Sequence, residues 1–187
     1  MSSSVNIPSE IQVLHKVCQT LQDQGIRYML TGSFAMHFHA NPRMTQDIDI
    51  VIELTPADVT VLCKALGSEF YSDEDMAIQA IEDSSMFNVI FQRTGIKIDF
   101  IIRKNSSFAK EAFLRRKDIA LLGKNISVAT AEDLVISKLD WARDTHSEMQ
   151  LRDVSNLLKI KTLDHYYIET WVDKLDLKEL YAKAKSY

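Results

Sequence analysis

Hydrophobic and polar positions alternate along this chain with two periods, and the change of period separates two portions. In the first portion, short apolar runs alternate with segments of helical spacing. The apolar runs predict strands at 26–31, 48–54, 87–92, 96–103, 119–122 and 126–128. The helical spacing predicts helices at 9–24, 33–40, 55–66 and 73–82. The first portion is therefore predicted to be a mixed α/β (α+β) structure.

The second portion begins at Thr130, where the period becomes helical throughout. Helices are predicted at 130–143, 148–159, 164–174 and 177–185. We expect an α/β core over 1–129 and a small helical portion over 130–187 that packs on it. No internal repeat or low-complexity segment interrupts this order.

Two of the predicted strands carry acidic residues among apolar ones. The 48–54 run is almost continuously apolar, which is typical of a buried central strand. The 96–103 run alternates, so that Lys97, Asp99 and Ile101 share one side, and Asp99 is its only acid. An isolated charge in a sheet is costly unless it is paired or bound to a metal.

The composition is that of an ordinary globular protein. The 187 residues are 46% hydrophobic and 26% charged, with a net charge of −4, which argues against a broadly basic nucleic-acid binder. A local basic run remains, for which a solvated helix face is favoured over a binding patch: Lys104, Lys110, Arg115, Arg116 and Lys117.

Cysteines and the N-terminus indicate the compartment. Cys18 and Cys63 are far apart and stand among apolar residues at helical spacing, so we expect buried free thiols in a reducing environment. No signal-peptide pattern and no apolar run of membrane-spanning length is present. We therefore expect a cytoplasmic protein with no membrane partner.

The candidate chemistry lies around a Gly-Ser turn and an Asp-x-Asp pair. Asp47 and Asp49 are spaced i, i+2, so on a strand their carboxylates point to the same side. Such close like charges call for a proton or a cation such as Mg²⁺ between them. Gly32 lets the backbone approach a phosphate, and Ser33 can donate to it at a helix N-terminus. If the strand of Asp99 is a neighbour, three carboxylates converge as in a two-metal site.

These motifs together resemble the nucleotidyltransferase superfamily with the polymerase-beta-like fold. The resemblance lies in Gly32-Ser33, in Arg43-x-Thr45-x-Asp47-Ile48-Asp49, and in the later single Asp99 in a hairpin strand. The chain looks most similar to the small branch that includes the AbiEii-type toxins. The resemblance implies a mixed sheet flanked by helices.

The resemblance also implies roles for individual residues. Gly32 and Ser33 would contact the nucleotide, Asp47 and Asp49 would bind Mg²⁺ (or Mn²⁺), and Asp99 would be the third ligand or general base. Two roles remain open for Arg43, which either binds a triphosphate or pairs with Asp47 and Asp49 in the empty site.

Lys138 is the notable residue of the helical portion. It lies inside an apolar stripe, with Leu134 one turn before it and Ala142 one turn after it. Its side chain either snorkels outward or reaches a buried anion, and the nearby phosphate site favours the anion. In the toxin-like branch, a lysine here and an Arg-Asp pair on the next helix take part in nucleotide binding and catalysis. The matching residues are Lys138 and Arg152-Asp153.

The leading hypothesis is a Mg²⁺-dependent enzyme that transfers a nucleoside monophosphate from an NTP to a hydroxyl acceptor. The acceptor would be RNA (a tRNA end in the toxin-like interpretation), a protein or a small molecule, and a toxin would have a cognate antitoxin as partner. A catalytically inactive nucleotide-binding or regulatory module is the alternative. A phosphohydrolase is disfavoured, because none of the five histidines is placed to activate water. The aromatics of the helical portion are expected in its core: Trp141, Tyr166, Tyr167 and Trp171.

Overall fold

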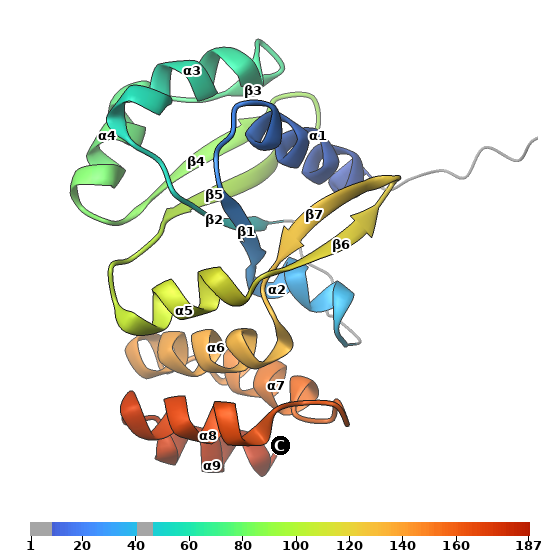
Figure 1. The fold of residues 1–187 in the computed structure, drawn as a ribbon, viewed down its shortest axis with the longest axis vertical. Helices are drawn as coiled ribbons and strands as arrows, with labels where there is room; N and C mark the ends of the chain where they lie inside the picture. Colours follow the sequence, from blue (N-terminus) through green and yellow to red (C-terminus); the bar gives the residue numbers. More distant parts are fainter. Residues whose placement is uncertain (1–8, 41–46) are drawn as a thin grey trace, which may run out of the picture.

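The fold is built on one mixed sheet, which Figure 1 shows at the centre of the molecule. The computed structural model describes residues 9–40 and 47–187. Over these residues, the sheet has seven strands in the order β3-β4-β5-β2-β1-β7-β6. Their bounds are β1 (Tyr28–Thr31), β2 (Ile48–Ile52), β3 (Phe70–Tyr71), β4 (Met86–Phe91), β5 (Ile96–Ile102), β6 (Lys117–Leu121) and β7 (Lys124–Val128). The prediction of a mixed sheet flanked by helices is thereby confirmed.

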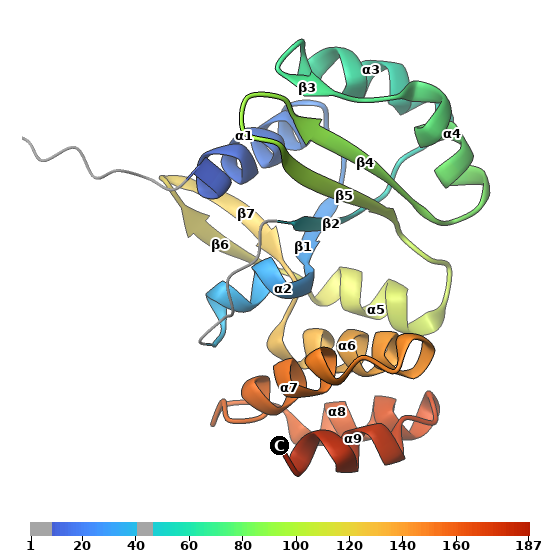
Figure 2. The same cartoon turned by 180° about the vertical axis from the view of Figure 1, so that it is seen from behind.

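The helices gather at two ends of the molecule. Figures 1 and 2 show α1, α3 and α4 at one end, α6 to α9 at the other, and α5 between the sheet and the second group. Their bounds are α1 (Ser9–Asp23), α2 (Gly32–Ala35), α3 (Pro56–Leu66), α4 (Glu74–Glu82), α5 (Ser107–Arg115), α6 (Ala131–Thr145), α7 (Glu148–Leu157), α8 (His165–Lys174) and α9 (Lys178–Lys185). A 3₁₀ turn, η1 (Met36–Phe38), follows α2.

The two faces of the sheet differ in burial. β2 lies between β1, which is antiparallel to it, and β5, which is parallel to it. On one face, Ile48, Ile50 and Ile52 of β2 are fully buried, as expected of a central strand. The opposite face is only partly covered and carries Asp49 and Asp99. On this face, Asp49 is half-buried and Asp99 is buried.

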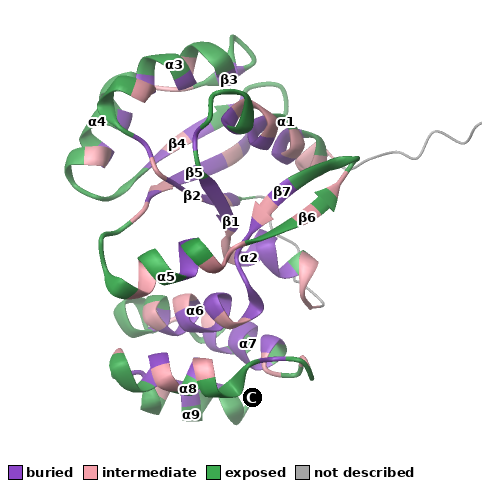
Figure 3. Cartoon of the chain, in the orientation of Figure 1, coloured by how far each residue is buried: buried purple, intermediate pink, exposed green. Residues whose placement is uncertain are grey.

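The core runs through both portions of the chain without a break. One cluster of buried side chains extends from Val13 in α1 to Ala184 in α9. Figure 3 shows buried residues in the sheet and also along the inner sides of α6 and α7. A boundary between 1–129 and 130–187 stays a prediction about sequence organisation, because the two portions share this core.

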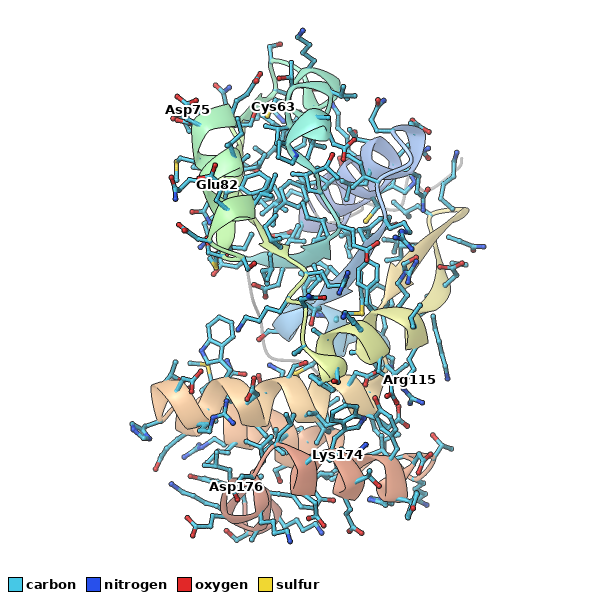
Figure 4. All side chains as sticks on the ribbon, turned by 60° about the vertical axis from the view of Figure 1, so that its left-hand side comes forward. Cys63, Asp75, Glu82, Arg115, Lys174 and Asp176 are labelled. Carbon is cyan, nitrogen blue, oxygen red and sulfur yellow. The ribbon has the colours of Figure 1, made fainter. Side chains whose placement is uncertain are left out.

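Several elements differ from the sequence-based predictions. The predicted helix over 33–40 is the single turn α2 followed by η1. β3 and α5 were not predicted, since β3 has only two residues and α5 buries only Ala112 and Phe113. The end of α5 also alters the interpretation of the basic run. Arg115, labelled in Figure 4, is not simply solvated, because its Nε lies 3.3 Å from Oδ2 of Asp133 in α6.

The expected core aromatics divide into two groups. Trp171 is 5% exposed and packs edge-on against Phe108, with ring centroids 5.3 Å apart. Trp141 is 51% exposed and Tyr166 is 83% exposed, so the prediction of core positions was wrong for these two residues. Helical periodicity gives a face of a helix, but it does not say how far the neighbouring elements cover that face.

The cysteines are free, as predicted, although Cys63 is only half-buried. Among the described residues, no helix has the length and the apolar character needed to cross a lipid bilayer.

Candidate active site

The centre of the candidate site is a pair of aspartates on neighbouring parallel strands. The β2–β5 register sets Asp49 directly beside Asp99, and Thr31 of β1 lies opposite Asp49 on the other side. Burial raises the pKa of Asp49 to about 6; the negative charges of Asp99 and Asp47 raise it too, while Lys138 and Lys97 oppose the shift. Asp47, exposed just before β2, is thus electrostatically coupled to the pair.

Asp99 is held by two neighbours on the same face of the sheet. Lys97 Nζ lies 3.0 Å from Oδ2 of Asp99, and Asn88 Nδ2 on β4 donates to Oδ1. The hydrogen bond to Asp99 raises the pKa of Lys97, and the charges of Asp47 and Asp49 add to this effect. Lys97 therefore places a positive charge beside Asp99. Alternation along β5 predicted Lys97 on the face of Asp99, but no pattern in the sequence indicated a role for Lys97 or Asn88.

Only a glycine fits at position 32, because the carboxylate of Asp49 fills the space that a Cβ atom would occupy. The φ of Gly32 is +65°, and a Cβ at this position would lie 1.9 Å from Oδ2 of Asp49. A side chain would therefore collide with the site as well as strain the backbone. The sequence analysis assigned Gly32 to phosphate approach, and the structure adds Asp49 as a neighbour that fills the space. The helix that begins at Gly32 is the single turn α2, so a phosphate-binding role of its N-terminus stays a prediction, and the polar side chain at this position is the buried Ser33.

Lys138 joins the helical portion to the Gly-Ser turn. Its Nζ lies 2.7 Å from Oδ2 of Asp153, 3.0 Å from Oε1 of Gln150 and 3.5 Å from Oγ of Ser33. Lys138 is 4% exposed and Asp153 is 3% exposed, so the snorkelling alternative is excluded. The nearest buried anion is Asp153 on α7. Gln150 was missed, because a single glutamine one turn before Asp153 has no recognisable pattern.

Of the two predicted arginines, only Arg152 lies in the described part of the chain. Arg43 falls outside the described residues. Arg152 is exposed, and its guanidinium lies 5.6 Å from the ring centroid of Tyr187. Of the Arg152-Asp153 pair, only Asp153 contacts Lys138.

Comparisons with known proteins identify the fold. No family model matches the chain, and no curated protein matches its sequence. Among solved structures, an antigenic nucleotidyltransferase-like protein from Paracoccidioides brasiliensis is 17% identical, with a TM-score of 0.56 over 92% of each chain. The fold is that of the nucleotidyltransferases.

Two further structures share this fold. A provisionally assigned nucleotidyltransferase of Thermotoga maritima is 18% identical, with a TM-score of 0.53 over 78% of this chain and 92% of that one. The lincosamide antibiotic adenylyltransferase LnuA, with lincomycin bound, is 12% identical, with a TM-score of 0.52 over 83% of this chain and 99% of its own. At these identities, the similarity establishes the nucleotidyltransferase fold alone.

A divalent cation is implied by this fold, and the donor set fits it in its chemistry. Carboxylate oxygens are the ligands that Mg²⁺ prefers, and a cation would relieve the repulsion felt by Asp49. Over residues 9–40 and 47–187, no three Asp, Glu, His or Cys side chains form a metal-binding group in their present arrangement. Asp99 instead faces Lys97 and Asn88. Loading of a cation would therefore release Lys97 from Asp99.

Proposed function

We propose that the protein transfers a nucleoside monophosphate from an NTP to a hydroxyl acceptor, with Mg²⁺ or Mn²⁺ as cofactor. One observation carries the proposal. Asp49 and Asp99 stand side by side on neighbouring strands, on the face of the sheet opposite the isoleucines of β2, and the Gly32-Ser33 turn lies directly against Asp49. The buried Lys138 reaches this turn from the helical portion. The Gly32-Ser33 turn is therefore flanked by carboxylates that could bind a cation and by a lysine that could bind phosphate oxygens.

The proposed reaction is a displacement at the α-phosphorus of the NTP. The acceptor oxygen forms a bond to this phosphorus, and the bond from the phosphorus to the oxygen bridging the α- and β-phosphates breaks. Pyrophosphate leaves with the electron pair, and the hydroxyl proton passes to Asp99, the proposed general base. Ser33 and Lys138 orient the phosphates, and alignment with electrostatic stabilisation supplies the rate, as in other phosphoryl transfers.

The cation would be held by Asp47, Asp49 and Asp99. When bound, it neutralises charge on the phosphate oxygens and lowers the pKa of the attacking hydroxyl. Asp153 holds the Nζ of Lys138 beside Ser33, so that the lysine would face the phosphates from this position.

The acceptor and the biological setting extend this proposal. RNA (including a tRNA end), a protein side chain and a small hydroxylated molecule are the acceptor classes to test. The lincomycin-bound adenylyltransferase of the same fold supports the small-molecule class. The motif resemblance, including Lys138 and Asp153, supports an AbiEii-like toxin with an antitoxin partner.

One observation favours a second candidate function. The Lys97–Asp99 ion pair already neutralises one acid of the site without a metal. A catalytically inactive nucleotide-binding module is expected to keep such a pair permanently. This candidate binds nucleotide but transfers nothing.

The test is a transfer assay with radiolabelled NTPs, Mn²⁺ or Mg²⁺, and three acceptor pools: total RNA, a protein lysate and a panel of small hydroxylated molecules that includes lincosamides. Wild-type protein is expected to label one pool. The Asp47→Ala/Asp49→Ala variant is expected to lose at least 100-fold in rate, because the cation loses two ligands.

The matched control removes two carboxylates far from the site. Asp75→Ala/Glu82→Ala alters α4, at the end of the molecule opposite the C-terminal helices in Figure 4, and is expected to retain wild-type transfer. Full transfer by Asp47→Ala/Asp49→Ala would overturn the proposed site. Nucleotide binding by wild type with no label in any pool would favour the inactive module.

A further inference from the structure

The exposure of Trp141 is unusual for its position in α6. Trp141 follows the fully buried Leu134 by seven residues, so both lie on nearly the same face of the helix. Leu134 is 1% exposed, whereas Trp141 is 51% exposed. The neighbouring elements therefore cover Leu134 but leave Trp141 partly uncovered, although the next residue, Ala142, is buried. Figure 3 shows buried and exposed positions along α6.

Trp141 is also a direct neighbour of Lys138 on the helix surface. Residues three apart in a helix have Cβ atoms about 5–6 Å apart. Helical side chains lean toward the N-terminus and cover the preceding turn, which for Trp141 is the turn that carries Lys138. Lys138 Nζ in turn lies 3.5 Å from Oγ of Ser33. A large flat apolar surface is therefore placed one turn beyond the contact proposed for the phosphates.

We infer that Trp141 is the stacking surface for the nucleobase, an inference that rests on the proposed function. An indole offers π-stacking to any base, whereas it offers an anionic phosphate no such interaction. A nucleotide whose phosphates lie at Ser33 and Lys138 would place its base toward the solvent-exposed end of α6, where Trp141 is uncovered. Because a purine has the larger ring system, stacking favours ATP and GTP over CTP and UTP.

The test uses the fact that the chain has only two tryptophans, Trp141 and Trp171. ATP binding is expected to quench the fluorescence of wild type and of Trp171→Phe, but not that of Trp141→Phe. In calorimetric titrations, Trp141→Ala is expected to bind ATP about tenfold more weakly, the effect of losing one stacked base. Trp141→Phe keeps an aromatic ring and is expected to retain most of the affinity.

Tripolyphosphate is the probe that isolates the base. Since it has phosphates but no base, it is expected to bind wild type and Trp141→Ala equally. Because Trp141 is exposed, Trp141→Ala is expected to have the far-ultraviolet circular dichroism of wild type.

Three outcomes are distinguishable. ATP affinity unchanged in Trp141→Ala, with quenching absent in wild type, would overturn the inference and leave the proposed transfer standing. ATP binding that depends on Trp141, without transfer to any acceptor pool, would support base stacking on Trp141 and contradict the proposed enzymatic transfer. Absence of ATP binding by wild type at millimolar concentration would overturn both.

Discussion

The contact between Gly32 and Asp49 shows how closely single residues constrain the site. We predict that Gly32→Ala destabilises the protein by about 3 kcal/mol, the sum of the positive φ and a methyl group forced into a filled space. The measurement is urea unfolding.

Gly95→Ala separates the two contributions. Gly95 has a φ of +72°, and nothing lies within 4 Å of the position of its absent Cβ. This control retains only the backbone strain, about 1 kcal/mol. Equal losses in the two variants would show that Asp49 does not occupy the space beside Gly32.

The ionisation of Asp49 gives a second prediction at this scale. Its pKa is raised from 3.8 to about 6, so the folded state binds the proton more tightly than the unfolded state. Stability contributed by protonated Asp49 is thus complete below pH 4, is lost as the pH rises to about 6, and stays lost above that value.

The side chain of the Asp49→Asn variant cannot ionise, so the variant does not lose this stability as the pH rises. It is expected to be more stable than wild type at pH 7 by about 1–3 kcal/mol, and similar to wild type at pH 4. Urea unfolding from pH 4 to 7 in the presence of a chelator is the measurement, with Asp75→Asn as control. A variant no more stable than wild type at pH 7 would contradict the burial of this charge. A residue that lowers stability is typical of a functional position.

Between elements, the Lys138–Asp153 pair connects α6 to α7. Removal of one partner leaves a buried charge uncompensated, so Lys138→Met is predicted to cost about 3–5 kcal/mol. The double variant Lys138→Met/Asp153→Leu is predicted to cost clearly less than Lys138→Met alone, while transfer is lost in both.

The matched control is the Lys178–Asp173 pair between α9 and α8, in which both side chains are exposed and Nζ and Oδ1 are 3.2 Å apart. Its removal is expected to cost less than about 1 kcal/mol. Additive losses at Lys138 and Asp153 in thermal unfolding would contradict a coupled buried pair.

At the scale of the whole molecule, the site is assembled from both portions of the chain. The acids come from the sheet, while Lys138, Gln150 and Asp153 come from the helical portion. The continuous core explains how this is possible, since α6 and α7 are packed rigidly enough to hold a lysine beside Ser33. The helical portion is thus part of the candidate site.

The sequence by itself determined six of the seven strands, most helices and the acidic motif of the described part of this protein. Period-2 and period-3.6 patterns depend on neighbours a few residues apart, so β2, β5 and α6 were predictable. Gly32-Ser33 and Asp47-x-Asp49 were recognisable for the same reason, since each is a short motif. The weakly patterned α5 and the two-residue β3 lacked such a signal.

Only the tertiary structure decided which residues meet. Asp49 and Asp99 are fifty positions apart, and their alignment depends on the parallel pairing of β2 with β5. The same applies to Lys138 and Asp153, and to the exposure of Trp141. The pairing of strands and the burial of a helix face depend on the packing of the whole core, so a local sequence pattern does not encode them.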